Sequence, residues 1–290
     1  MTIPILNASG CLDALMAPEV AQTLDAFVTK TVTPLPREGN TPPRIAETEH
    51  GMLNSIGLQN PGIDAFLAHT LPRLGELERP IWVSVGGFSA QDYADVCERL
   101  EGCSEVVTIE LNLSCPNVEE APETASELVA AARETTCKPL YAKLSPASDV
   151  AETARAVADA GADGLSLVNT LRGLALEPAL DAPRVGRGPG GYSGPALRPI
   201  ALAAVYACAR AVELPIVGMG GIARGQDALE FLAAGATVLS LGTVLFADPF
   251  AALRVRAEMD REAVSLGYTS AAAVRGAAHG SVASAALSSE

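Results

Sequence analysis

The sequence is short of aromatic residues, positive charge and histidine. Aromatic residues make up 4% of its 290 residues, and 20 lysines and arginines stand against 34 aspartates and glutamates, a formal net charge of −14. An acidic surface gains nothing from nucleic acid or an anionic membrane, so we expect neither as a partner. There are three histidines, His50, His69 and His279, and we expect all three at the surface.

Metal-binding patterns and membrane-spanning runs are also missing. The six cysteines contain no C-x-x-C pair, so we predict no metal site, and no zinc ion or iron–sulfur cluster held by this chain itself. No apolar run approaches the roughly 20 residues needed to cross a bilayer, and no signal peptide is recognisable. We therefore expect a soluble, cytoplasmic protein with reduced thiols.

What the sequence has is a large apolar fraction, 49% of the residues, arranged in short β-rich runs that alternate with helical patterns. Several runs are continuously apolar, as in parallel strands covered on both faces. The eight candidate strands are residues 3–8, 27–32, 81–85, 106–111, 140–144, 164–168, 215–219 and 237–241. This alternation predicts an α/β protein with one (β/α)8 TIM barrel, and a doubly wound parallel sheet is the alternative.

The composition along the chain predicts one domain, a C-terminal tail and two long connections between strands. We expect the barrel over residues 1–266 and an Ala/Ser/Gly-rich tail over 267–290 that frays, at least in its last dozen residues. Two connections, 33–60 after the second strand and 170–194 after the sixth, are long enough to be lids or binding loops.

Two helices have recognisable start signals. A capping box at Thr124 and Glu127 predicts one helix start, and Ser148 is a candidate cap for the helix over 149–160.

Polar residues and glycines follow every candidate strand at the same end. In a (β/α)8 barrel these carboxyl ends form the active site. The ends of the last two strands carry Gly220-Gly221 and Gly242-Thr243. Paired glycine loops at this place often bind phosphate through backbone amides, so we predict a phosphate site there, with a plain turn as the alternative.

Lysines and asparagines mark the other strand ends. Lys30 and Lys143 each interrupt an apolar strand, which suggests anionic or electron-rich ligand atoms, although both could instead extend to the rim. Four asparagines are expected around the same opening, and their amides both donate and accept, as recognition of a planar amide or imide ring requires. They are Asn54, Asn112, Asn117 and Asn169.

Cys115 is the best candidate for an acid or base at the barrel mouth, because no histidine follows a strand. A thiol serves as a base only when nearby positive charge or hydrogen-bond donors lower its pKa. Ser114, the neighbouring amides and the two lysines are candidates for this effect. The other five cysteines fall in helices, loops or strand starts and are expected to be inert.

Several ordered motifs make the sequence resemble the dihydroorotate dehydrogenase family, in particular its class 1B catalytic subunit. The resemblance covers residues 4–250. The motifs are Thr29-Lys30, residues 37–40 with Pro43-Arg44, residues 52–62, 110–118 and 143–146, Asn169-Thr170, and residues 190–196 and 218–222.

This resemblance implies an FMN enzyme that oxidises (S)-dihydroorotate to orotate in de novo pyrimidine synthesis. Cys115 would take the C5 proton while a hydride leaves C6 for flavin N5, and Lys143 would stabilise charge on the reduced flavin. The implied substrate-binding residues are Lys30, Asn54, Ile56, Gly57, Leu58, Asn112, Asn117, Asn169 and Thr170. The implied FMN-binding residues are Ser9, Lys30, Thr31, Asn112, Lys143, Val168, Gly194, Gly220, Gly221, Gly242 and Thr243.

The resemblance also implies partners. A cysteine at the base position and the absence of an N-terminal membrane segment favour class 1. The amino-acid sequence of residues 54–62 favours class 1B. Class 1B implies a homodimer, or a heterotetramer with a subunit that carries FAD and a 2Fe–2S cluster and passes electrons to NAD. The chain departs from the family at the short 118–122 segment, at Ser84 and at Ala147.

Three alternatives remain open. A dihydropyrimidine dehydrogenase-type flavin barrel shares the Asn-Leu-Ser-Cys-Pro motif and acts on a uracil-like ring. A catalytically idle FMN-binding subunit would lack activity despite its retained Cys115. A phosphosugar-binding barrel would have no flavin at all.

Overall fold

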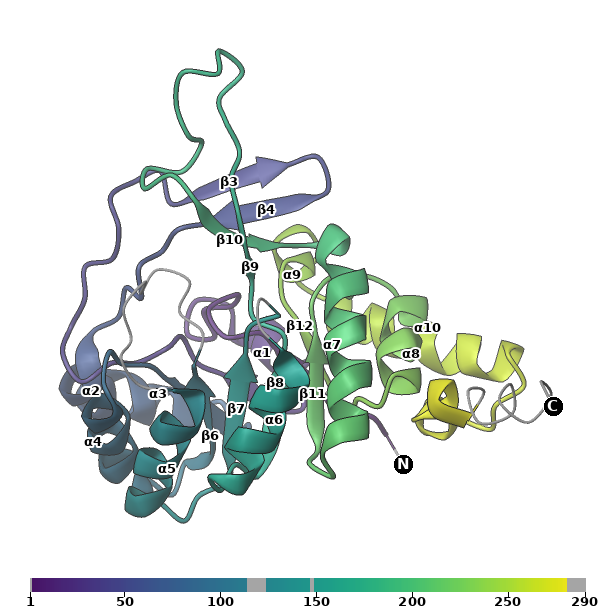
Figure 1. Ribbon diagram of the computed structural model, residues 1–290, viewed down its shortest axis with the longest axis horizontal. Coiled ribbons are helices and arrows are strands. Elements are labelled where there is room, and N and C mark those ends of the chain that lie inside the picture. The colour runs from purple at the N-terminus through teal and green to yellow at the C-terminus, as the bar shows by residue number, and fades with distance from the viewer. Residues whose placement is uncertain (1, 114–123, 147–148, 281–290) are drawn as a thin grey trace.

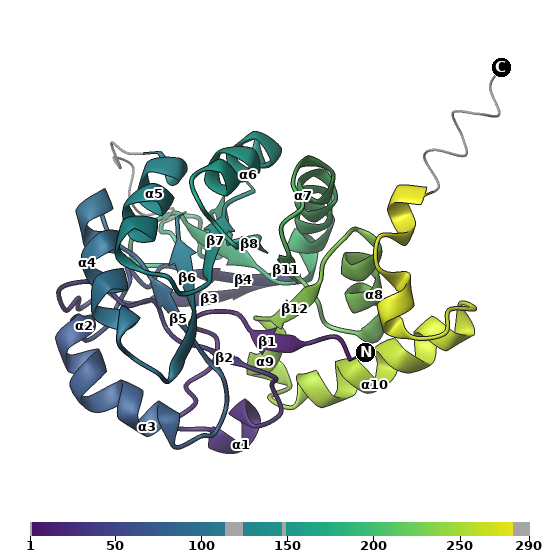
Figure 2. The same cartoon turned by 90° about the horizontal axis from the view of Figure 1, so that it is seen from below.

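The computed structural model of the chain describes residues 2–113, 124–146 and 149–280. A barrel of parallel strands lies at its centre, ringed by helices (Figure 2). Around the barrel the strand order is β1-β12-β11-β8-β7-β6-β5-β2. The strands are β1 (Ile5–Asn7), β2 (Phe27–Val28), β5 (Ile81–Val85), β6 (Val106–Asn112), β7 (Leu140–Leu144), β8 (Gly164–Leu167), β11 (Ile216–Met219) and β12 (Val238–Leu241). All eight predicted strands are present, and the (β/α)8 prediction is confirmed.

The helices pack outside the strands. They are α1 (Pro18–Ala21), α2 (Gly62–Ala65), α3 (Leu71–Gly75), α4 (Ala90–Glu101), α5 (Ala125–Thr135), α6 (Val150–Asp159), α7 (Arg198–Ala211), α8 (Gly225–Ala233), α9 (Val244–Ala247) and α10 (Ala251–Ser265). Three further helical segments are the π-helix η1 (Phe66–Thr70) and the 3₁₀-helices η2 (Pro195–Leu197) and η3 (Ala271–Val274). The Thr124–Glu127 capping box at the start of α5 is confirmed. At α6 the cap is Asp149, whose carboxylate accepts from the Glu152 amide, whereas the predicted cap Ser148 lies outside the described residues.

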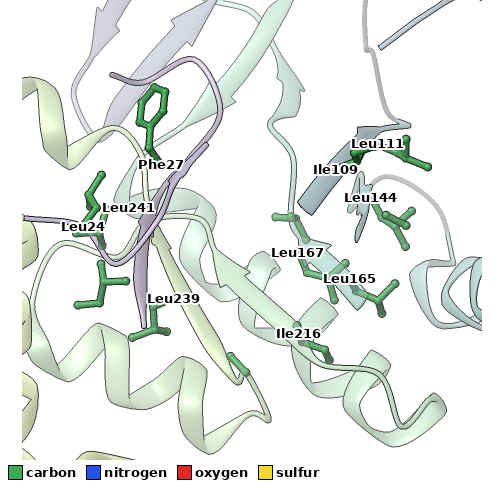
Figure 3. Packing of buried hydrophobic residues seen from close by; sticks show 14 of the residues in the cluster. Leu24, Phe27, Ile109, Leu111, Leu144, Leu165, Leu167, Ile216, Leu239 and Leu241 are labelled. Atoms are coloured by element: carbon green, nitrogen blue, oxygen red, sulfur yellow. The ribbon is translucent and has the colours of Figure 1, made fainter. Parts of the chain in front are cut away.

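Side chains along each barrel strand point alternately to the apolar core between strands and helices and to the interior of the barrel. In β6, Ile109 and Leu111 belong to the main apolar core between strands and helices, where Figure 3 shows them near Leu144. Successive side chains of a strand point to opposite faces, so Glu110 and Asn112 point into the barrel. The outward side chains of β6 therefore stabilise the barrel by apolar packing against the helices. Its inward side chains supply polar groups to the mouth of the barrel.

A side-chain amide closes the seam between the first two strands. The Asn7 Oδ1 atom accepts from the Val28 amide at 2.8 Å, and the Asn7 Nδ2 atom donates to the Val28 carbonyl at 2.8 Å. Asn7 is fully buried, and the backbone pairing between the two segments includes the bridge between Leu6 and Ala26 and a hydrogen bond from the Asp25 amide to the Ile5 carbonyl at 3.0 Å. The Asn7 side chain thus replaces two ladder hydrogen bonds at this point.

The second strand is shorter than predicted. It ends at Val28 because the Thr29 hydroxyl, in place of a backbone carbonyl, accepts from the Ser84 amide at 3.1 Å. The chain rejoins the barrel at the bridge between Val32 and Val85. Lys30 therefore lies on an irregular segment at the barrel mouth.

The two long connections form a second sheet above the barrel (Figure 1). Its antiparallel order is β3-β4-β10-β9, and we call it the lid sheet. The strands are β3 (Ile45–Thr48), β4 (Gly51–Asn54), β9 (Leu171–Gly173) and β10 (Gly190–Ser193). The sequence predicts two long loops here but not that they pair with each other.

The chain beyond Gly267 is packed for part of its length. Ala271 and Val274 in η3 are buried, and residues 281–290, in the part of the tail where fraying is predicted, lie outside the described residues. The His279 ring stacks on Tyr206 of α7 with ring centroids 4.4 Å apart, so this histidine is not a simple surface residue. The division of the chain at residue 266 stays a prediction. Across the described ranges no helix is long and apolar enough to cross a membrane, and the cytoplasmic location stays a prediction.

Candidate active site

One cavity of about 440 Å³ lies at the carboxyl ends of the barrel strands, under the lid sheet. Every predicted site residue that the structure describes lines this cavity. These residues are Ser9, Lys30, Thr31, Asn54, Ile56, Gly57, Leu58, Asn112, Lys143, Val168, Asn169, Thr170, Gly194, Gly220, Gly221, Gly242 and Thr243. Cys115 and Asn117 lie outside the described residues, as do the short 118–122 segment and Ala147. The structure thus brings the described residues together, and their individual roles stay predictions.

Lys143 lies at the floor of the cavity beside a buried carboxylate. Its Nζ atom is 3.2 Å from the Oε1 atom of Glu110, and the two side chains are 7% and 2% exposed. The two residues lie on adjacent strands, with Lys143 paired in register with Asn112. A buried ammonium of this kind is stabilised by its carboxylate partner. Lys143 therefore does not extend to the solvent, and the rim alternative is wrong for this residue.

Two asparagines are joined across the cavity floor. The Asn169 side-chain amide donates to the Asn112 Oδ1 atom at 2.8 Å, and the Thr170 backbone amide donates to the Asn169 Oδ1 atom at 2.8 Å. The Tyr93 hydroxyl of α4 donates to the Asn112 carbonyl at 2.7 Å and fixes the end of β6. These bonds hold the amides in one orientation, ready to donate to and accept from a ring.

The lid sheet adds a third asparagine from above. Asn54 at the end of β4 donates to the Gly191 carbonyl of β10 at 3.2 Å. A Cβ atom on Gly191 would collide with the Thr170 hydroxyl and would lie 3.2 Å from the Asn54 amide nitrogen. Glycine at this position therefore lets the lid sheet approach the cavity closely.

Glycine loops form the side of the cavity next to β11 and β12. Gly220 and Gly221 have φ values of +121° and +81°, and Gly242 and Thr243 follow β12 in the adjacent loop. The Thr243 hydroxyl donates to the Ser193 Oγ atom at 3.0 Å. Backbone amides and hydroxyls at this place suit the oxygens of a phosphate group.

Small hydroxyl side chains lie beneath the cavity on the side of β2 and β5. The Ser9 hydroxyl donates to the Thr29 carbonyl at 2.8 Å, and Thr31 Oγ1 is 3.0 Å from Ser84 Oγ. Ser84 is fully buried behind Thr31, which lines the cavity, so this departure from the family pattern has its hydroxyl bonded within the protein.

Several residues that line the cavity were not singled out from the sequence. They include apolar residues of the lid sheet and of α9, such as Ile45, Met52 and Phe246. Such side chains carry no motif and become identifiable only when the loops are placed.

Cys11, one of the five cysteines that were expected to be inert, also lines the cavity. Burial raises the pKa of its thiol, more than Lys143 and Lys30 lower it. Cys11 therefore favours the protonated thiol, consistent with the expected lack of reactivity. Among the described residues, no group of three or more His, Cys, Asp or Glu side chains could hold a metal ion.

The chain is similar in sequence to proteins of one family. Residues 1–262 match the profile of the family described as dihydroorotate dehydrogenase. A relative from Citrifermentans bemidjiense is 44% identical over 290 residues, which cover 96% of this chain and 94% of the relative. A relative from Listeria monocytogenes is 42% identical over 280 residues, with 92% and 91% coverage. Both are named dihydroorotate dehydrogenase B (NAD(+)), catalytic subunit.

A solved structure is similar in fold. The dihydroorotate dehydrogenase of Eimeria tenella, in complex with ferulenol, superposes with a TM-score of 0.79 over 95% of this chain and 85% of that one. Its sequence is 22% identical, so this likeness supports the barrel architecture alone.

Proposed function

Because the chain belongs to the dihydroorotate dehydrogenase family, whose members catalyse the flavin-dependent oxidation of dihydroorotate in pyrimidine biosynthesis, we propose that it is the FMN-binding catalytic subunit of a class 1B enzyme. The observation that carries this proposal is a single cavity. It joins glycine loops beside β11 and β12 to Lys143, Asn112 and Asn169 on the side of β6, β7 and β8.

The residues around the cavity fit FMN. The loop of Gly220 and Gly221, whose φ values only glycine adopts readily, would suit a group that needs many donors and little space, as a phosphate does. Lys143 supplies positive charge where a reduced ring would carry negative charge. When bound, FMN supplies the hydride acceptor for the reaction. In this proposal Ser9, Thr31, Val168, Gly194, Gly242 and Thr243 complete its site, together with Lys30 and Asn112.

Dihydroorotate suits the remaining part of the cavity. Its carboxylate would be attracted by Lys30, and its ring amides match the side-chain amides of Asn54, Asn112 and Asn169. Ile56, Gly57, Leu58 and Thr170 would enclose the ring, with Asn117 as a further contact. The Asn169–Asn112 hydrogen bond fixes two of these amides before the substrate arrives, which reduces the ordering needed on binding.

Cys115 is the proposed base. Its thiolate would take the proton from C5 while the hydride leaves C6, so that the C5–C6 double bond of orotate forms. Its place directly after β6, next to the segment that carries Asn112, supports this role. Positive charge from the two lysines would favour the thiolate.

Substitution of the base tests this proposal. We expect Cys115→Ala to retain FMN but to oxidise dihydroorotate about 100-fold or more slowly near neutral pH, since a positioned base contributes on the order of 10²–10⁴ in rate. Stopped-flow reduction of the bound flavin measures the step directly. Cys137→Ala, which removes an exposed thiol, is the control. Turnover of Cys115→Ala at the wild-type rate would remove the thiol-base role.

The electron acceptor is proposed from the relatives, whose names contain NAD(+) and describe a catalytic subunit. We propose that this chain passes electrons to NAD through a partner subunit carrying FAD and a 2Fe–2S cluster, in a heterotetramer built on a homodimer of this chain. NAD reduction by the purified chain alone would contradict this arrangement.

A further inference from the structure

A buried carboxylate lies behind the glycine loop that follows β11. Asp227 in the first turn of α8 is 1% exposed. It accepts from the backbone amides of Ala223 at 2.9 Å and Arg224 at 3.0 Å, and it pairs with the guanidinium of Arg198 on α7. A carboxylate so deeply buried is stable only with such partners, so the Asp227 carboxylate and the loop amides that it bonds stabilise each other.

A second carboxylate holds the next amide of the same segment. Glu258 of α10 accepts from the Gly225 amide at 2.9 Å, and Arg254 donates to the Ala223 carbonyl at 3.0 Å and to Glu258 at 3.2 Å. Burial alone would raise the pKa of Glu258, but the Gly225 amide and Arg254 outweigh it and hold this pKa below its usual value. The loop is therefore anchored from α7 on one side and from α10 on the other.

These anchors divide the amides of the segment into two groups. The amides of residues 223–225 donate to the two carboxylates. Within the described part of the chain, the amides of Gly220, Gly221 and Ile222 donate to no other group, and these residues line the cavity. The second group is thus available to a ligand because the first group fixes the shape of the loop.

Arg198 also supports the glycine turn directly. A Cβ atom on Gly221 would lie 2.9 Å from the Arg198 Cβ atom and 3.1 Å from its amide nitrogen, so the start of α7 lies against the turn. The Arg198 guanidinium offsets the charge of Asp227, and Arg224 lies 3.7 Å from the same carboxylate. Without these cations, a buried carboxylate near the loop would repel a phosphate dianion.

We propose that Asp227, paired with Arg198, is a positioning residue for the phosphate end of the cofactor: it holds the 220–224 loop so that three backbone amides face the phosphate. This proposal rests on the proposed function, since it takes FMN as the occupant of the cavity. It predicts that the effect of Asp227 is confined to ligands that carry the phosphate.

The test compares FMN with riboflavin, which lacks the phosphate. The full-length chain is stripped of flavin, and each dissociation constant is measured by quenching of flavin fluorescence. We expect Asp227→Asn to weaken FMN binding about tenfold or more, since a charge-assisted hydrogen-bond network is lost, and to leave riboflavin binding within about twofold. A purely structural role would weaken both ligands together or neither, and either result would overturn the proposal.

Asp163→Asn is the matched control. The Asp163 carboxylate likewise accepts from a backbone amide, that of Leu140 at 2.8 Å, and pairs with Arg133 at 2.9 Å, but it precedes β8 at the opposite end of the barrel. We expect it to leave the affinities for FMN and riboflavin unchanged. An FMN-selective loss in this variant would show that the effect is not specific to the loop and would contradict the proposal.

Glu258→Gln covers the case in which Asp227→Asn does not fold. Because it weakens one amide anchor only, we expect a smaller loss that is still selective for FMN. Equal losses for FMN and riboflavin would overturn the proposal. A wild-type chain that bound neither flavin would overturn the proposed function as well, whereas a wild-type preference for FMN that survives in Asp227→Asn would overturn the positioning role alone.

Discussion

At the scale of the residue, the Lys143–Glu110 pair shows how the barrel interior holds charge. Both side chains are almost fully buried, and their charged atoms are 3.2 Å apart. Moving either ion out of water costs several kcal/mol, which the attraction between them offsets only while both are present. The pair thereby keeps a positive charge at the floor of the cavity.

Substitution of Glu110 tests whether the buried Lys143 ammonium depends on its carboxylate partner. We expect Glu110→Gln to lower the free energy of unfolding by about 3–5 kcal/mol, because Lys143 is left buried without its carboxylate. Urea unfolding measures the change. The control is Asp64→Asn, which breaks the exposed pair with Arg99 and should cost less than about 1 kcal/mol. Similar losses in the two variants would show that the buried pair has no special role.

The sequence identifies Lys143 more readily than its partner. A lysine inside an apolar strand is conspicuous, and its need for a partner can be stated in advance. The identity of that partner depends on the register between β6 and β7, which places Glu110 opposite Tyr141 and Asn112 opposite Lys143. Strand register is set by the assembled sheet, so Glu110 could not be singled out from residue types alone.

At the scale of the element, the seam between β1 and β2 depends on one side chain. Asn7 bonds both the amide and the carbonyl of Val28, where the backbone ladder is interrupted. We expect Asn7→Ala to lower the free energy of unfolding by about 2–6 kcal/mol, since two buried backbone groups lose their partner at about 1–3 kcal/mol each.

Urea unfolding again gives the measurement. Gln91→Ala is the control, since Gln91 bonds Asp95 on the exposed face of α4, and we expect a change within about 0.5 kcal/mol. A loss of stability in Asn7→Ala as small as that of the control would mean that the seam does not need the Asn7 amide.

The elements also show where sequence patterns stop being informative. The barrel strands are apolar runs of ordinary length, so all eight could be predicted. The lid strands are short, and β10 contains two glycines, which weaken any strand signal. They form because segments far apart in the chain pair, as Asn54 does with Gly191, and such pairing leaves no local trace.

At the scale of the whole molecule, the barrel topology gathers the site. Parallel strands deliver all their carboxyl ends to one opening, so polar residues that follow the strands must meet there. This is why the lysines, asparagines and glycine loops of the site could be predicted as one group, including residues as distant in sequence as Lys30 and Thr243. Ile56, Gly57, Leu58, Val168 and Gly194 were predicted only from the resemblance to the family. The apolar lining from the lid and the Asp227 anchor behind the glycine loop depend on loop placement and could not.

The measurement that tests the account most directly is anaerobic reduction of the bound flavin. The purified chain is mixed with (S)-dihydroorotate, and the oxidised-flavin absorption band is followed, with dihydrouracil in a parallel experiment. We predict rapid loss of the band with dihydroorotate and no change with dihydrouracil, because Lys30 and the asparagines of the cavity match a ring that carries a carboxylate. A band that persists with dihydroorotate but bleaches with dihydrouracil would contradict the account.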